Sequence, residues 1–187
     1  AVRAIRPEGG AIRVSILRNN QVDMLDKVAA VDGFVVRDNG VGFNQAHRDS
    51  FDTLYTELKA ADGGKGFGRF TCLKYFHRLT VESVFQDGLA RKQRSFTMGT
   101  GNDIIIDERV IDAGDADTGS IVTISGIGSI KFPDKGLDVI ARVLVEKLLP
   151  YFIDPNSECP RIVVEDGGGS VILNDYLTQA NRQIIEL

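Results

Sequence analysis

Tryptophan is absent from this sequence, and cysteine, methionine and proline are scarce. The 187 residues contain no Trp, two Met, five Pro and two Cys. Two cysteines as far apart as Cys72 and Cys159 are too few for a disulfide framework or a zinc site, which favours reduced thiols in a cytoplasmic protein. No apolar run is long enough to cross a bilayer, and the N-terminus lacks the pattern of a signal peptide. We therefore expect a cytoplasmic protein with no membrane partner.

An excess of basic charge is also missing. The chain has 26 acidic and 22 basic residues, so its net charge is −4, and it carries no overall basic footprint for nucleic acid. A hydrophobic fraction of 43% at this length is typical of one globular domain with a sizeable core. We expect a single domain over residues 1–187, in which residues 155–187 form an added hairpin and helix or the start of a further segment.

Glycine is abundant, and its first notable positions follow an apolar run. Phe34–Val36 predicts a buried strand, Asp38 falls where that strand ends, and Gly40 and Gly42 follow it. The glycines would let the backbone turn sharply against a ligand, while the carboxylate could accept a hydrogen bond from an exocyclic amine. A plain β-turn is the alternative, because Asp-Asn-Gly is a strong turn signal.

A second glycine cluster lies about twenty residues further on. It consists of Gly63, Gly64, Lys65, Gly66, Phe67, Gly68 and Arg69. Phe70, Leu73 and Phe76 follow at helical spacing, so the glycines precede a helix whose N-terminal amides and dipole would face a phosphate group. Lys65 and Arg69 would add positive charge. The alternative is a mobile loop in which glycine supplies flexibility.

The order and spacing of these motifs resemble the GHKL ATPases, which include gyrase, heat-shock chaperone ATPases, MutL and Microrchidia proteins, and sensor histidine kinases. Their D-x-G-x-G box is similar to residues 38–42, and their second glycine box is similar to residues 63–68. A Gly-Thr that leads into a late strand in the family is similar to Gly119-Ser120, where serine keeps the hydroxyl. The resemblance extends from Ala1 to about Ile127.

The resemblance implies an α/β two-layer sandwich, with a mixed, mostly antiparallel sheet, helices on one face, and ATP with Mg²⁺ bound beneath a lid at residues 44–68. It implies that Asp38 accepts from the adenine amine and that Gly42 and Ser120 border the base. The amides of residues 64–68 would then hold phosphates. ATP would close the lid and bring two copies of the chain together.

The family's first box, E-x-x-x-N-A-x-D-A, matches poorly. Residues 1–4 resemble its tail, with Arg3 where an Asp is common, so the chain is expected to begin inside that helix. The Glu that activates water and the Asn that holds Mg²⁺ would precede Ala1, and we assign no catalytic residue or metal ligand in this sequence. The resemblance implies ATP binding with slow hydrolysis. A histidine-kinase ATP-binding domain and a non-hydrolysing nucleotide-binding module are the alternatives, and the downstream protein or DNA partner is not indicated.

Hydrophobic periodicity predicts the remaining elements. We expect strands at residues 11–17, 28–36, 79–85, 93–98, 103–107 and 121–127, helices at 44–59 and 137–152, a hairpin at 161–173, and a last helix at 176–185 capped by Asn174. His47 and Lys59 are expected to be exposed helix residues. The acidic loop at residues 112–117 lacks the ligand order of an EF-hand, which favours a solvated loop over a calcium site.

Overall fold

A single sheet of eight strands organises the structure, a computed structural model that describes residues 9–19, 28–53, 68–127, 136–153 and 159–176. The strands lie in the order β5-β4-β3-β6-β2-β1-β7-β8. Every neighbouring pair is antiparallel except β1 and β7, which are parallel. The strands are β1 (Ala11–Arg18), β2 (Val31–Asp38), β3 (Phe76–Asp87), β4 (Ala90–Met98), β5 (Ile105–Asp112), β6 (Gly119–Ile127), β7 (Arg161–Asp166) and β8 (Gly169–Ile172).

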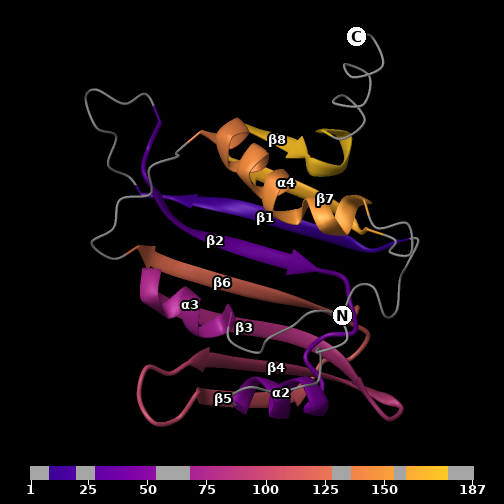
Figure 1. The fold of residues 1–187 in the computed structure, drawn as a ribbon. Helices are drawn as coiled ribbons and strands as arrows, with labels where there is room; N and C mark the ends of the chain where they lie inside the picture. Colours follow the sequence, from indigo (N-terminus) through magenta and orange to yellow (C-terminus); the bar gives the residue numbers. More distant parts are fainter. Residues whose placement is uncertain (1–8, 20–27, 54–67, 128–135, 154–158, 177–187) are drawn as a thin grey trace, which may run out of the picture.

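The described helices cover one face of this sheet (Figure 1). They are α2 (Gln45–Asp52), α3 (Gly68–Tyr75) and α4 (Leu137–Ile153). In Figure 1, α4 lies in front of the β1, β7 and β8 end, whereas α2 and α3 lie in front of the β3, β4 and β5 end. None of the helices in the described ranges is long and apolar enough to span a membrane. The expected architecture, a mixed and mostly antiparallel sheet with helices on one face, is therefore confirmed.

Two hydrophobic clusters fill the space between the sheet and the helices. The first lies beneath α4, where Ile140 and Ala141 pack with Val164 of β7 and the fully buried Leu173. The second joins Leu79, Val81, Phe96 and Met98, with Cys72 and Leu73 of α3 packed against them. Burying such side chains supplies most of the favourable free energy of folding. Cys72 thus lies on the side of α3 that packs against the sheet.

The register of β1 and β2 decides which side chains face the helices. Ile12 pairs with Asp38, and Ile16 pairs with Phe34, so these four residues share the face that packs beneath α4. Side chains alternate between the two faces of a strand. Arg13 and Arg37, which also pair directly, therefore lie on the face opposite the described helices.

Several element boundaries differ from the sequence-based expectation. The strand predicted at 103–107 is found at Ile105–Asp112, an exposed edge strand whose side chains show no alternation in burial, so periodicity could not position it. Phe76 was expected on the helix after the glycine cluster, but it begins β3. There its ring makes an edge-to-face contact with Phe34, at 6.2 Å between centroids.

The C-terminal hairpin belongs to the same sheet. β7 pairs with β1, and β8 forms the outer edge. Asn174 does not cap a helix as predicted: its Oδ1 accepts from Ile162 N at 2.8 Å and its Nδ2 donates to Pro160 O at 3.1 Å. These bonds fasten the start of β7, which explains the need for an amide side chain. The helix expected at 176–185 lies almost wholly outside the described residues.

Candidate functional site

The first glycine motif forms a tight loop at the end of β2. Asp38 is the last residue of the strand, and its Oδ1 accepts a hydrogen bond from Gly40 N at 2.8 Å. This leaves Oδ2 available as an acceptor. No hydrogen bond or ion pair to a basic side chain in the described ranges occupies the Asp38 carboxylate.

Two glycines allow close backbone approaches around Asp38. Gly42 has φ of +76°, and a Cβ at this position would lie 1.9 Å from the carbonyl oxygen of Val84. A Cβ at Gly119 would lie 2.3 Å from the carbonyl oxygen of Asp38. A side chain at either position would clash with backbone, so both glycines are required by packing.

Ser83 connects the loop after Asp38 with the start of β6. Its hydroxyl oxygen accepts from Phe43 N at 2.8 Å and donates to Gly119 O at 2.7 Å. Ser120 Oγ lies 3.0 Å from Ser83 Oγ. A hydroxyl has one proton to donate, so Ser120 must be the donor in that contact. All the hydrogen-bonding capacity of the buried Ser83 is therefore used, whereas Ser120 keeps acceptor capacity for a ligand.

Arg94 of β4 holds the end of this loop that leads into α2. Only 4% of this residue is exposed, and its Nη1 donates to the carbonyl oxygens of Phe43 at 2.9 Å and Asn44 at 3.0 Å. Its Nη2 donates to Gln45 Oε1 at 2.7 Å, and the guanidinium stacks on Phe85 at 4.9 Å. Burial lowers the pKa of Arg94, yet arginine stays protonated in proteins. The loop is thus fastened to β4 by a permanent charge.

Glu108 supplies the counter-charge and links the loop to α2. Its Oε1 lies 3.0 Å from Arg94 Nε as an ion pair without hydrogen-bond geometry. Its Oε2 accepts from Arg48 of α2, at 3.2 Å from both Nε and Nη2. Arg48 also donates to Asp52 at 2.7 Å, and these bonds raise its pKa, Glu108 contributing most. The first part of the predicted lid is therefore a helix tied to β5.

Two amide side chains and one imidazole complete the loop. Asn39 ties it to the start of β1, since Ala11 N donates to its Oδ1 and its Nδ2 donates to Gly9 O, both at 2.9 Å. Asn44 caps α2 by accepting from His47 N at 3.0 Å. His47 Nδ1 lies 3.0 Å from Gly42 O. His47 is thus partly buried and supports the loop, instead of being simply exposed.

The structure brings Asp38, Gly40, Gly42 and Ser120 together, because Asp38 and Ser120 pair directly across β2 and β6. Gly68 begins α3, so the glycine cluster does lead into a helix, although the side chain of Arg69 is not described. Residues 63–67 of the cluster, Lys59 and residues 1–8 lie outside the described ranges. Within those ranges, no group of three or more His, Cys, Asp or Glu side chains is arranged to hold a metal ion.

A pocket of about 320 Å³ lies at the ends of β2, β3 and β6. Asp38, Ser83, Gly119 and Ser120 take part in its lining. Most of the other strand residues that line it belong to the opposite face, namely Arg37, Glu82, Val84, Gln93 and Ile121, so the pocket lies mainly on the face away from the helices. The predicted site residues therefore border a cavity.

Sequence reasoning missed Ser83 and Arg94, although the pattern of β3 and β4 contained a signal. Ser83 stands between Val81 and Phe85, and Arg94 precedes Phe96 by two positions, so strand alternation turns both polar side chains inward. A polar residue in an inward position requires hydrogen-bond partners. Here those partners are the backbone groups of the site loop.

No protein-family model and no curated protein matches this sequence at a significant level. Among solved structures, the chain is similar to the ATPase region of Saccharomyces cerevisiae topoisomerase II, with a TM-score of 0.55 and 16% identity over 86% of this chain and 42% of that one. The same region bound to ICRF-187 (dexrazoxane) matches with the same values. The 43K ATPase domain of Thermus thermophilus gyrase B in complex with an aminocoumarin matches with a TM-score of 0.46 and 16% identity, over 87% of this chain and 39% of that one.

These likenesses concern the fold. The chain shares the fold of the topoisomerase II ATPase region, in agreement with the fold that the two glycine motifs predicted. It spans less than half the length of the structures it matches.

Proposed function

We propose that this protein binds ATP at the helix-covered face of the sheet, where β2 ends and β6 begins. The observation that carries the proposal is the direct pairing of Asp38 of β2 with Ser120 of β6. The loop that follows Asp38 is held in place by hydrogen bonds from Phe43 to Ser83 and from Arg94 to Phe43. Preformed sites with a few fixed polar groups are typical of ligand pockets. The GHKL fold, which is shared with the ATPase region of topoisomerase II, supports the same location.

The hydrogen-bonding state of the two side chains favours adenine over guanine. Asp38 Oδ2 is an acceptor, and Ser120 offers acceptor capacity because its proton is donated to Ser83. Adenine presents an exocyclic amine, a donor, where guanine presents a carbonyl oxygen, an acceptor. When the base turns its 6-position toward Asp38, acceptors leave guanine O6 unpaired, which typically costs about 1–3 kcal/mol. The preference belongs to this orientation of the base, since guanine also carries donors at N1 and N2.

The phosphates would lie toward the N-terminus of α3. Anions bind at helix N-termini because the first backbone amides and the helix dipole point at them. We assign the amides of residues 64–68 to phosphate binding and Lys65 and Arg69 to charge neutralisation, as the glycine-box resemblance implies. Mg²⁺ would accompany the nucleotide and would neutralise part of its phosphate charge.

We extend the proposal to slow ATP hydrolysis, lid closure by residues 44–68 and ATP-dependent pairing of two copies, all of which the resemblance implies. Single-turnover release of ADP distinguishes a hydrolase from a module that holds nucleotide unchanged. Sedimentation velocity with and without the nucleotide tests the pairing of copies.

Calorimetric titration with a non-hydrolysable ATP analogue and Mg²⁺ tests the nucleotide site. We compare the native protein with Asp38→Asn and Asp112→Asn. Asp112 is a matched control, because its Oδ1 accepts from Gly114 N at 2.9 Å in a turn like that of Asp38, but at the far edge of the sheet. Asparagine keeps the turn and turns the second acceptor into a donor.

We expect Asp38→Asn to weaken binding about ten- to a hundredfold, because the loss of a hydrogen bond from the base amine to a charged acceptor costs about 1.5–3 kcal/mol. Asp112→Asn should bind as the native protein does, and the guanine analogue should bind more weakly than the adenine analogue. Equal affinities for the native protein and Asp38→Asn would refute the assignment of Asp38 to the base.

A further inference from the structure

We infer that Ser83 of β3 determines which purine the proposed nucleotide site accepts, and that it acts as a positioning residue, through the hydroxyl of Ser120. This role rests on the proposed function and names the residue that sets its base specificity. Hydrogen bonds around Ser83 fix the place of one proton, that of the Ser120 hydroxyl. The place of that proton decides whether Ser120 accepts from a purine amine or donates to a purine carbonyl oxygen.

Backbone groups determine the direction of the hydrogen bonds at Ser83. Phe43 N donates to Ser83 Oγ at 2.8 Å, and Ser83 Oγ donates to Gly119 O at 2.7 Å. An amide N–H only donates and a carbonyl oxygen only accepts, so neither bond can be reversed. The one proton of Ser83 is thereby used. The contact of 3.0 Å between Ser83 Oγ and Ser120 Oγ must therefore take the proton of Ser120.

Burial stabilises this arrangement of protons. Only 3% of Ser83 is exposed, and it stands between the buried Val81 and Phe85 on β3. Turning either hydroxyl away would leave a buried polar group unpaired, which is costly. Ser120 is only partly buried and takes part in lining the pocket at the ends of β2, β3 and β6. Ser120 is therefore held as an acceptor toward a ligand.

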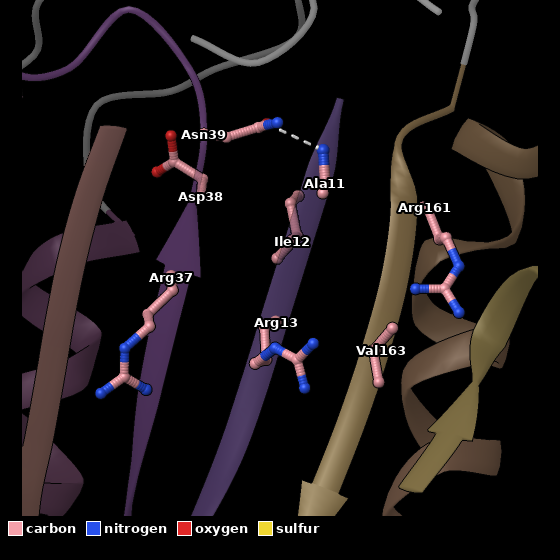
Figure 2. A pocket seen from close by; sticks show the side chains of 8 residues that line it. All are labelled: Ala11, Ile12, Arg13, Arg37, Asp38, Asn39, Arg161 and Val163. Atoms are coloured by element: carbon pink, nitrogen blue, oxygen red, sulfur yellow. Dashed lines mark hydrogen bonds between the residues drawn. The ribbon is translucent and has the colours of Figure 1, made fainter. Parts of the chain in front are cut away.

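The second acceptor, Asp38, lies on the same side of β2 as Ser120. In Figure 2 the Asp38 carboxylate points away from β1, whereas the next residue, Asn39, extends toward Ala11. The other neighbour of β2 is β6, where Asp38 pairs with Ser120. Because Oδ1 of Asp38 accepts from Gly40 N, Oδ2 is the oxygen that remains for a ligand.

One amino group can use both acceptors. Its two hydrogens diverge by about 120°, so two acceptors that each lie about 2.9 Å from the nitrogen are about 5 Å apart. Residues directly opposite on neighbouring strands, as Asp38 and Ser120 are, have Cβ atoms about 4.5–5.5 Å apart. The amine of a 6-aminopurine thus matches the pair, whereas a 6-oxopurine in the same orientation turns its oxygen toward two acceptors.

Removal of the Ser83 hydroxyl would change this selectivity in one direction. In Ser83→Ala, the Ser120 hydroxyl loses its acceptor, so its proton becomes available to the oxygen of a 6-oxopurine. Ser120 still accepts from the amine of a 6-aminopurine, because a hydroxyl has two lone pairs. The 6-oxopurine therefore gains affinity relative to the 6-aminopurine. A loss of loop structure alone would weaken the binding of both purines equally.

Calorimetric titration with the non-hydrolysable imido analogues of ATP and inosine triphosphate, each with Mg²⁺, tests this role. The two analogues differ at the 6-position and at the N1 proton that accompanies it. The proteins are the native chain, Ser83→Ala, Ser120→Ala, the double variant and the control Ser95→Ala. Ser95 lies between the buried Arg94 and Phe96 on β4, so its hydroxyl is on the opposite face of the sheet.

We expect the native protein to prefer the adenine analogue about ten- to a hundredfold, since the inosine oxygen would stay unpaired. In Ser83→Ala this preference should fall about tenfold, the effect of one recovered hydrogen bond. Ser95→Ala should keep the native preference. Ser83→Cys nearly preserves the shape of the buried side chain but is a weak acceptor, so its preference should fall in the same direction even if Ser83→Ala does not fold.

The double variant identifies Ser120 as the intermediary. When Ser120 is already alanine it has no proton to release, so the further change Ser83→Ala should leave the preference as it is in Ser120→Ala. A double-mutant cycle measures this coupling. If Ser83→Ala lowers the preference equally with and without the Ser120 hydroxyl, the role of that proton is refuted.

The nucleotide site and the role of Ser83 fail in different ways. A native protein that binds neither analogue would refute the proposed function and, with it, the role of Ser83. Binding with the same preference in the native protein and in Ser83→Ala and Ser83→Cys would leave the nucleotide site in place and overturn the role of Ser83. Equal binding of both analogues by the native protein would also overturn it.

Discussion

At the scale of single residues, Gly42 is the described position where backbone geometry restricts the sequence most. Its positive φ costs any other residue about 1–2 kcal/mol, and a Cβ would lie 1.9 Å from Val84 O. We predict that Gly42→Ala lowers the free energy of unfolding by about 2–5 kcal/mol, which adds an overpacking cost to the backbone term. Urea unfolding followed by circular dichroism measures this value.

Gly88 provides the matched control for that prediction. It has φ of +61° in the turn between β3 and β4, and a Cβ there would meet nothing within 4 Å. Gly88→Ala should therefore cost about 1–2 kcal/mol, the backbone term alone. If both variants lose the same stability, the close approach to Val84 has no energetic consequence.

Among the site residues, those with a local signature were predictable and those defined by long-range contacts were not. Asp38 and Gly42 belong to a short motif with turn chemistry of its own. Ser83 contacts Phe43, which is 40 residues away, and Arg94 contacts Asn44, which is 50 residues away. Such partners depend on the order of the strands, which the sequence pattern does not determine.

At the scale of elements, α2 is attached to the sheet mainly through Arg94 and Glu108, with aromatic packing of Phe51 against Phe96 at 5.4 Å between ring centroids. We predict that Arg94→Met weakens this attachment. The substitution removes the donor to Phe43 O and to Gln45 Oε1, whereas Asn44 O keeps Arg48 N at 2.9 Å, so local opening should become about 2–3 kcal/mol easier. Amide exchange in α2 should then be about thirty- to a hundredfold faster by mass spectrometry.

Arg109→Ala is the control for α2, because Arg109 is exposed on the neighbouring strand β5. It should leave the exchange of α2 unchanged. If Arg94→Met accelerates exchange equally in all strands, the substitution lowers global stability and the specific attachment of α2 is refuted.

Elements with strong periodicity were predicted well. α4 was expected at 137–152 and runs over Leu137–Ile153, because its broad apolar face is unmistakable. The strands predicted at 79–85 and 93–98 are found as β3 and β4, and both are longer than predicted. β5 was misplaced because an exposed edge strand need not alternate.

At the scale of the whole molecule, the question is whether the two hydrophobic clusters unfold together. We predict that they do, because β2 and β6 join them in one continuous hydrogen-bonded sheet. Leu173→Ala removes a fully buried side chain from the cluster beneath α4 and should cost about 2–5 kcal/mol. In Leu173→Ala, the free energy of opening measured by hydrogen exchange at the slowest amides of β4, which lies in the other cluster, should fall by the same amount.

Leu89→Ala is the control for this prediction, since Leu89 is fully exposed in the turn between β3 and β4. It should leave the hydrogen-exchange protection of both clusters unchanged. Protection of β4 that survives Leu173→Ala would show two units that unfold independently.

The strand order itself could not be obtained from the sequence. The pattern predicted strands and helices, and the glycine motifs predicted the fold by resemblance, but no local signal states that β6 lies between β2 and β3. Nor does any local signal indicate that β7 pairs with β1 in parallel. Such pairings arise from which surfaces are buried together, and that is a property of the complete chain.

The parallel pairing of β1 and β7 also bears on how the protein is made. β1 is synthesised first among the described strands, yet its partner β7 follows more than a hundred residues later. At ordinary rates of translation this interval is on the order of ten seconds, during which one edge of the nascent β1 has no native neighbour. The chain through β7 must therefore emerge from the ribosome before the sheet can close around β1.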